Sequence, residues 1–273
     1  MTRILTRNDV LGRTEEEFLR LGEQALIEEY KLKPSIALRW HAERAKVLTQ
    51  AEADESRLEE CGVTLVTAAD ASYPRQIENF DPDAAAMLYL YGNRRLLSAD
   101  TFCVLSSRNS PPEALTEIEL RTEEHVLRGK ILVTGHDTEA YQRSAVTSLR
   151  WGSPRIVVLD SGFFQVMGDE LRNELFPAAR LWRYEFDAQT DLAIAAVAPT
   201  GTYHRNSNRI RDRIVAGLSL TQDYIIVSPG GNMEKLARLA ARAGRNASIS
   251  ELSPVFDPFI AMGLQPLPVS RRR

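Results

Sequence analysis

One stretch decides the fold of this protein: residues Arg205–Gly231, which read R-N-S-N-R-I-R-D-R-I-V-A-G-L-S-L-T-Q-D-Y-I-I-V-S-P-G-G. Its arginine-rich first half has the apolar spacing of an amphipathic helix. The run Tyr224–Val227 has the length and β-branched content of a buried strand. A glycine turn then leads into a second helix. Because the free amides and the dipole of a helix N-terminus both favour an anion, this strand–turn–helix order predicts a phosphate site.

The same alternation extends back to about Thr101. Strands are predicted at residues 102–105, 130–134, 155–160, 181–186 and 224–228, and helices at 112–128 and 138–151 fit between them. Short apolar strands that alternate with helices indicate βαβ units. We therefore predict an α/β fold with a Rossmann-like, doubly wound, mostly parallel sheet. Ligands of such sheets bind at the carboxyl ends of the strands.

A helical pattern precedes the sheet. Thr14–Glu17 forms a capping box, Pro34 separates two predicted helices, and Gly62 ends the last of them. Short strands are predicted next, at residues 63–67 and 87–93. We therefore expect a small all-helical N-terminal domain at residues 1–62, the Rossmann-like domain at 63–252 and an irregular, proline-rich tail at 253–273.

The overall composition is that of an ordinary globular protein. A formal net charge of -3 argues against a uniformly basic binder but is compatible with a basic groove. Cys61 and Cys103 lie far apart beside apolar residues, which predicts buried free thiols and no disulfide or metal site. The chain shows no signal-peptide pattern and no apolar run of membrane-spanning length. We therefore expect a cytoplasmic protein without membrane association.

Four arginines fall within nine residues of this acidic chain: Arg205, Arg209, Arg211 and Arg213. If a helix begins near residue 207, Arg209 and Arg213 share one face and Arg211 projects elsewhere. A guanidinium suits phosphate because its planar fork donates two parallel hydrogen bonds. The cluster therefore predicts phosphate contacts. The alternative is a solvated helix face paired with Asp212 and Asp223.

Further phosphate candidates lie at the predicted strand ends. Arg108 follows the first strand of the sheet, and Gly135, Gly230 and Gly231 would let a phosphate approach the backbone. Pairing with a carboxylate such as Glu113 is the alternative for the arginine. Turn formation alone is the alternative for the glycines.

No catalytic constellation is recognised. His136 and Asp137 are adjacent, so they cannot readily form a base and its orienting partner, and no nucleophile motif accompanies them. We predict no catalytic residue, metal or cofactor. The basic residues after the glycine turn are expected to form a solvated face, and the tryptophans are expected to pack in the core: Lys235, Arg238, Arg242 and Arg245, and Trp40, Trp151 and Trp182.

The order of motifs resembles the DprA/Smf family of DNA-processing proteins. The strongest match is Arg211–Ser219, R-D-R-I-V-A-G-L-S, which is similar to the family's R-N-R-I-I-A-G-L-S. Further similar segments follow the family's order along nearly the whole chain: Ser72–Pro74, Leu88–Asn93, Val104–Arg108, Val133–Gly135 and Ile156–Gly162. The chain departs from the family at Ser106, where the family has glycine, and at Ser228–Gly231, where it has an acidic residue and serine–glycine. It also leaves no room for the C-terminal winged helix of some members.

The resemblance implies a divergent, non-enzymatic protein of DNA processing and recombination, in natural transformation or a related process. It implies binding of single-stranded DNA through the arginine-rich site, homodimerisation and a RecA-type recombinase as partner. It also implies a SAM-like N-terminal domain.

Two other functions stay open from the sequence. Pro229–Gly231 is similar to the P-G-G-x-G-T motif of the Lonely Guy nucleoside-monophosphate hydrolases, whose fold resembles that of DprA, although Asn232 and Met233 interrupt the motif. A nucleotide-binding sensor or hydrolase is therefore the alternative function. The third possibility is a scaffold that acts by self-association.

Overall fold

The computed structural model describes residues 2–269, which divide into two compact units. One comprises the chain up to Gly62 together with Thr67–Tyr73, and the other comprises Val63–Val66 and the chain from Pro74 onward. The first unit is helical: α1 (Thr2–Leu11), α2 (Glu15–Leu19), α3 (Glu23–Glu28) and α4 (Pro34–Glu60). The predicted capping box opens α2, and Gly62 follows α4 with a φ of +72°, as its position predicted.

The second unit is built on one sheet. Among residues 2–269 the sheet has nine strands in the order β1-β2-β6-β5-β4-β3-β7-β8-β9. They are β1 (Val63–Thr67), β2 (Met87–Gly92), β3 (Thr101–Leu105), β4 (Ile131–Thr134), β5 (Arg155–Leu159), β6 (Leu192–Ala195), β7 (Thr221–Tyr224), β8 (Asn246–Ser250) and β9 (Gln265–Leu267). β2 runs antiparallel to β6, whereas the pairs from β6 to β9 are all parallel. The predicted Rossmann-like, mostly parallel α/β fold is confirmed.

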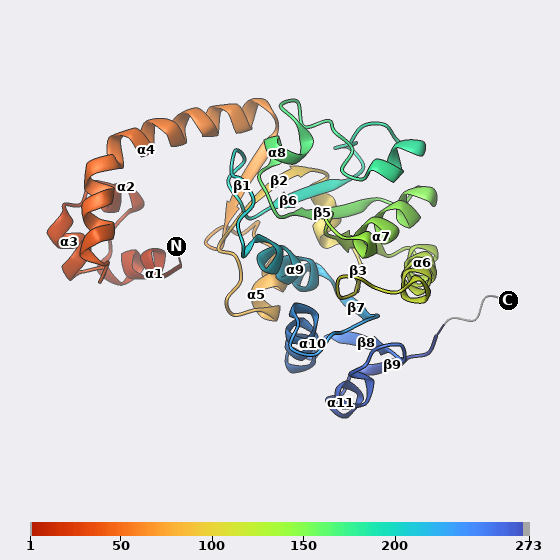
Figure 1. The fold of residues 1–273 in the computed structure, drawn as a ribbon. Coiled ribbons are helices and arrows are strands. Elements are labelled where there is room, and N and C mark those ends of the chain that lie inside the picture. Colours follow the sequence, from red (N-terminus) through yellow and green to blue (C-terminus); the bar gives the residue numbers. More distant parts are fainter. Residues whose placement is uncertain (1, 270–273) are drawn as a thin grey trace. The chain divides into compact units, whose positions relative to one another are not determined.

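Helices cover both faces of this sheet (Figure 1). α6 (Pro112–Leu127) and α7 (Glu139–Arg150) lie on one face, and α9 (Ser207–Leu218) and α10 (Asn232–Arg242) lie on the other. Right-handed crossovers require this arrangement, because the chain runs from β3 to β5 in one direction and from β7 to β9 in the other. The carboxyl ends of β3 and β7 therefore flank the switch point. The remaining helices are α5 (Arg75–Phe80), α8 (Phe163–Met167), α11 (Phe256–Ala261) and the 3-10 turns η1 (Arg94–Ser98) and η2 (Pro177–Leu181).

The core lies on the central strands. Every residue of β3, β5 and β6 is buried, as expected for parallel strands covered on both faces. Both cysteines are free thiols as predicted, although Cys61 is only half-buried. Burial raises the pKa of the Cys103 thiol to about 12. No helix within residues 2–269 is both long and apolar enough to cross a bilayer.

One predicted strand is wrong. Residues 181–186 alternate like a strand, but Leu181 is the last residue of η2 and is 82% exposed, and residues 182–186 form an irregular segment. The strand of this region is β6, whose run L-A-I-A is short and alanine-rich and so gave a weak β signal. The strand predicted at residues 224–228 lies earlier in the chain than predicted, because β7 spans Thr221–Tyr224. Ile225 continues the pairing by donating its N–H to the Leu105 carbonyl, at 2.8 Å.

The predicted irregular tail is wrong over residues 253–269. α11 and β9 lie there, and β9 pairs in parallel with β8, so the sheet extends beyond the predicted end of the domain at residue 252. The run Q-P-L is too short and too proline-rich to be recognised as a strand from sequence alone. Residues 270–273 lie outside the described residues.

A fully buried arginine anchors the segment before β6. The Arg155 guanidinium donates to Asp191 at 2.9 and 2.6 Å and to Glu174 at 3.2 Å, and none of the three side chains is exposed. Its backbone N–H also donates to Asp191, at 2.9 Å. Arg183 adds ion pairs to the same two carboxylates. The irregular segment is thus held to β5 by charge.

Replacing Arg155 by methionine leaves two buried carboxylates without their main partner. We expect Arg155→Met to lower the free energy of unfolding by about 3–5 kcal/mol, measured by urea denaturation. The matched control is Arg172→Met, since Arg172 is exposed and its ion pair within residues 2–269 is with the exposed Glu170. Equal stability of the two variants would contradict the anchoring role.

Candidate functional site

Arg211 occupies the carboxyl edge of the sheet as a buried ion. Its side chain is 2% exposed and lies among three aspartates: Asp137 after β4, Asp160 after β5 and Asp212 on α9 itself. The guanidinium is 3.3 Å from Asp160 and 2.8 Å from Asp212, and it also pairs with Asp137. Its carbon lies over the Tyr141 ring, 5.1 Å from the centroid. Arg211 lines the edge crevice described below, but its charge is already paired with these carboxylates, so we omit it from the proposed contacts.

Asp212 extends this cluster to two further helices. It accepts hydrogen bonds from the Tyr141 hydroxyl on α7 and from the Asn232 amide on α10, each at 2.7 Å. The cluster therefore joins both helix layers across the sheet edge. From the sequence, Asp212 was named as a partner of the arginines only in the alternative. Asp137 and Asp160 were missed as partners: Asp137 lies three residues after the predicted strand 130–134, and Asp160 is the last residue of the predicted strand 155–160.

Gly135 is required by this packing. A Cβ at Gly135 would lie 2.6 Å from the Tyr141 ring and 2.9 Å from Nε of Arg211. The sequence predicted that a phosphate would approach the backbone at Gly135. In this structure the side chains of Tyr141 and Arg211 approach it.

His136 borders the same cluster. Its Nε2 is 3.7 Å from Asp160, and its buried Nδ1 has no hydrogen-bond partner among the described residues. Burial lowers the pKa of His136 below its ordinary value. The positive charge of Arg211 lowers this pKa further, whereas the negative charges of Asp160 and Asp137 raise it. The ring is therefore favoured in its neutral form. Among residues 2–269, no group of three or more histidine, cysteine or acidic side chains is placed to hold a metal ion.

Arg108 and Arg205 are the exposed members of the predicted set. Arg108 follows β3, is 64% exposed and reaches Asp137 at 3.0 Å, not the predicted alternative partner Glu113. Arg205 lies exposed in the turn before α9. Both can meet a phosphate from solvent.

The glycine turn after β7 is closed by its own hydrogen bonds. Gly230 has a φ of +73° and donates its N–H to the Glu234 carboxylate at 2.5 Å. Gly231 donates to the Ser228 carbonyl at 3.1 Å. Neither amide is free for a phosphate in this conformation.

Arg209 and Arg213 share a face of α9, as their spacing predicted, and they face α10 across a groove. This α9–α10 groove has a volume of about 310 Å³ and contains five cationic side chains: Arg209, Arg213, Lys235, Arg238 and Arg242. Arg213 also pairs with the buried Asp81, and Arg238 with Glu234 at 2.6 Å. The three residues from α10 were expected to form a solvated face. Two features of the sequence could have predicted this groove. The basic residues of α10 recur at helical spacing, and consecutive crossover helices that run in the same direction lie on the same face of the sheet.

A second opening lies at the switch point. This edge crevice, about 270 Å³ in volume, is bordered by the loops after β3 and β7 and includes Arg108, Tyr141 and Asn232. Asn232 also lines the α9–α10 groove. The two openings therefore border the same side chain, and we consider them together as one candidate site.

This chain is similar to one protein family and to several solved structures. The family model described as DNA recombination-mediator protein A matches residues 64–249. DNA processing protein A from Streptococcus pneumoniae is similar in structure, with a TM-score of 0.73 and 16% identity over 97% of this chain and 88% of that chain. DNA processing protein A from Helicobacter pylori, described for its single-stranded DNA binding mode, has a TM-score of 0.56 and 14% identity over 75% and 90%. At these identities the two structures show the fold alone. No curated protein matches this chain in sequence.

The burial of Arg211 predicts a role in stability. Arg211→Met leaves Asp160 and Asp212 buried without their cation, so we expect a loss of about 3–5 kcal/mol in the free energy of unfolding by urea denaturation. Arg209→Met is the control, because Arg209 lies two residues earlier on α9 and is exposed, and this variant should unfold like the wild type. A wild-type midpoint for Arg211→Met would refute the structural role.

The lowered pKa of His136 predicts a pH dependence. Because the unfolded chain takes up this proton more readily than the folded one, the free energy of unfolding should fall as the pH drops through the ordinary value of 6.5. His136→Asn should reduce this fall. The measurement is urea denaturation at about pH 7.5 and about pH 5.5, on either side of the ordinary pKa. Parallel profiles for wild type and variant would rule out the effect.

Proposed function

Because this chain belongs to the DNA recombination-mediator protein A family, as its motifs predicted, we propose that it binds single-stranded DNA through the phosphates of the strand. Membership of this family supports a role in DNA processing. We further propose, from the family resemblance, that it acts as a cytoplasmic homodimer without catalysis of its own and cooperates with a RecA-type recombinase.

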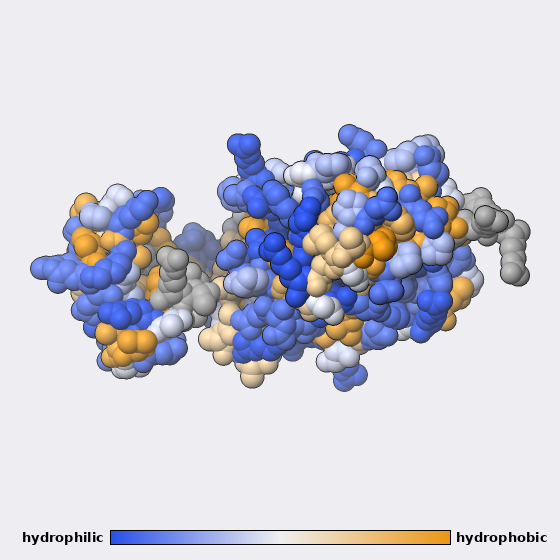
Figure 2. Space-filling model, turned by 90° about the horizontal axis from the view of Figure 1, so that it is seen from below, coloured by the Kyte–Doolittle hydropathy of each residue, from blue (hydrophilic) through white to orange (hydrophobic). Residues whose placement is uncertain are grey.

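The observation that carries the proposal is the charge of the α9–α10 groove. Five cationic side chains line it, and none of the described residues that line it is acidic. Within the described residues, the side chains of Arg209, Lys235 and Arg242 make no hydrogen bond or ion pair, so their charges are available to a ligand. Hydrophilic residues gather over α10 on the face seen from below and give way to hydrophobic ones over α11 (Figure 2).

A groove of this kind suits a nucleic-acid backbone. Each cation that meets a phosphate releases a condensed counterion, and this gain does not depend on the base. The groove is open to solvent at the helix surface and joins the edge crevice at Asn232. A strand in the groove can therefore continue to Arg108, and Arg205 lies exposed just before α9 as a further contact. We assign the phosphate contacts to Arg108, Arg205, Arg209 and Arg213, together with the cations of α10.

The nucleotide alternative has less support. It depended on the Pro229–Gly231 turn as a phosphate cradle, but Glu234 accepts the Gly230 N–H and supplies a negative charge there. A phosphate would have to displace this carboxylate. DNA binding in the α9–α10 groove requires no such change.

The test is fluorescence anisotropy of a labelled single-stranded oligonucleotide at several salt concentrations. Arg209→Gln with Arg242→Gln removes two free cations, so binding should weaken for every sequence. The slope of log K against log salt should become shallower by about 1.4, since each contact to a single strand contributes about 0.7.

The matched control removes the same charge elsewhere in the same unit. Arg128→Gln with Arg172→Gln changes two exposed arginines that lie outside the groove. It should bind like the wild type. If the groove variant is folded and keeps the wild-type affinity and slope, the assignment of the phosphates to this groove is wrong.

A further inference from the structure

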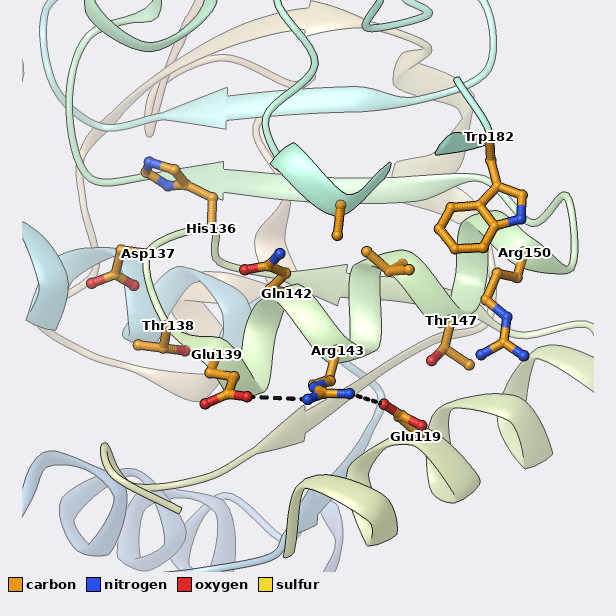
Figure 3. A pocket seen from close by; sticks show the side chains of 12 residues that line it. Glu119, His136, Asp137, Thr138, Glu139, Gln142, Arg143, Thr147, Arg150 and Trp182 are labelled. Atoms are coloured by element: carbon orange, nitrogen blue, oxygen red, sulfur yellow. Dashed lines mark hydrogen bonds and ion pairs between the residues drawn. The ribbon is translucent and has the colours of Figure 1, made fainter. Parts of the chain in front are cut away.

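A third groove runs along α7 on the opposite helix layer (Figure 3). It has a volume of about 670 Å³ and extends from His136 and Asp137, at the carboxyl edge, to Arg150 and Trp182 at the far end of the helix. Figure 3 shows the Trp182 ring and the Arg150 side chain at that end, with the guanidinium directed away from the ring toward Thr147. α7 has 12 residues, so the groove follows it for about 18 Å.

Trp182 offers an exposed aromatic surface on an anchored segment. The residue is 50% exposed and was expected to pack in the core. The backbone before it is fixed by the buried residues Phe176 and Ala179, and the Ala179 carbonyl accepts the N–H of Trp182 at 2.9 Å. Arg183, the next residue, is held by ion pairs to Glu174 and Asp191. Little ordering is therefore needed before a flat ligand can stack on the indole.

The cation at the same end of the groove is free, whereas the acids of the groove are paired. Glu119 and Glu139 both bind Arg143, at 2.7 and 3.2 Å. Asp137 binds Arg108 and Arg211. The Arg150 side chain makes no hydrogen bond or ion pair with the residues that the structure describes. The end of the groove therefore combines an open ring with an unpaired positive charge.

The α7 groove connects with the proposed DNA path. Asp137 and Thr138 line it and also line a smaller opening of about 220 Å³ that contains Arg108. Arg108 and Thr138 line the edge crevice as well. A strand that leaves the α9–α10 groove can thus pass Arg108 at the carboxyl edge and enter the α7 groove.

We propose that the Trp182–Arg150 end of the α7 groove is a nucleobase site, in which Trp182 stacks on a base of the bound strand and Arg150 binds a neighbouring phosphate. The site rests on the proposed single-strand binding and adds a second helix layer to the path of the strand. An aromatic ring and a guanidinium at one end of a groove match the alternating flat and anionic parts of a single strand.

Two oligonucleotides of equal length test the proposal: one that carries bases and one that is abasic, with the same number of phosphates. Trp182→Leu should weaken binding of the base-bearing strand about fivefold or more and leave the abasic strand unchanged. Arg150→Gln should weaken both. Trp151→Leu is the matched control, because Trp151 is also 50% exposed but does not line the groove, and it should bind both strands like the wild type.

Tryptophan fluorescence gives a second readout that does not depend on affinity. The chain has three tryptophans, so the quenching caused by the base-bearing strand should persist in Trp151→Phe and be lost in Trp182→Phe. Far-UV circular dichroism checks that each variant is folded.

Three results would count against the site. If Trp182→Leu binds the base-bearing strand like the wild type, or weakens both strands equally, the base site is wrong while the proposed function stands. If Trp182→Phe keeps the full quenching, the base lies elsewhere. If the wild type binds neither strand at low salt, the proposed function fails, and the base site fails with it.

Discussion

The buried charge of Arg211 is the constraint on which the carboxyl edge depends. Removing a guanidinium from water costs several kcal/mol unless nearby carboxylates offset the loss of hydration. Asp137 and Asp160 follow neighbouring strands, so parallel pairing brings both to one edge, where Arg211 meets them from α9. Asp212 adds Tyr141 and Asn232 from the two helix layers. Sheet and helices are thereby fixed relative to one another at the place where such folds bind ligands.

Closing that edge with internal ions changes where a ligand can bind. Arg211 faces three aspartates, and the glycine turn after β7 is capped by Glu234. The guanidinium of Arg211 and the N–H of Gly230 therefore already have internal partners and are not available to a phosphate. The available cations lie instead on the outer surfaces of the helices, above all between α9 and α10. A long anionic polymer can reach such a surface more readily than a small nucleotide buried at the switch point, because it needs only an open groove.

A second buried arginine, Arg155, plays a comparable part at the opposite, amino edge of the sheet, where β5 begins. Arg155 holds Asp191 and Glu174 with no exposure to water, and this fixes the irregular segment that carries Trp182. The sequence of this segment alternates like a strand, but its backbone does not join the sheet. It holds the Trp182 ring at the surface instead. Buried ion pairs thus position the segment whose Trp182 we propose to meet DNA.

The fold class, the order of most elements and the division of the arginines on α9 were predictable from local periodicity, because apolar runs mark the strands and helical spacing separates Arg211 from Arg209 and Arg213. The family was predictable from a different signal, the resemblance of the motif at Arg211–Ser219 and of the segments that precede it. The pairing of Arg211 could not be predicted in this way, because Asp137 and Asp160 lie 74 and 51 residues away in the chain and meet it only in the folded protein. Only the tertiary structure decided this pairing, and it likewise decided that Lys235, Arg238 and Arg242 face α9, that residues 181–186 form no strand and that β9 extends the sheet. Burial and pairing arise from contacts between distant segments, and no local pattern encodes them.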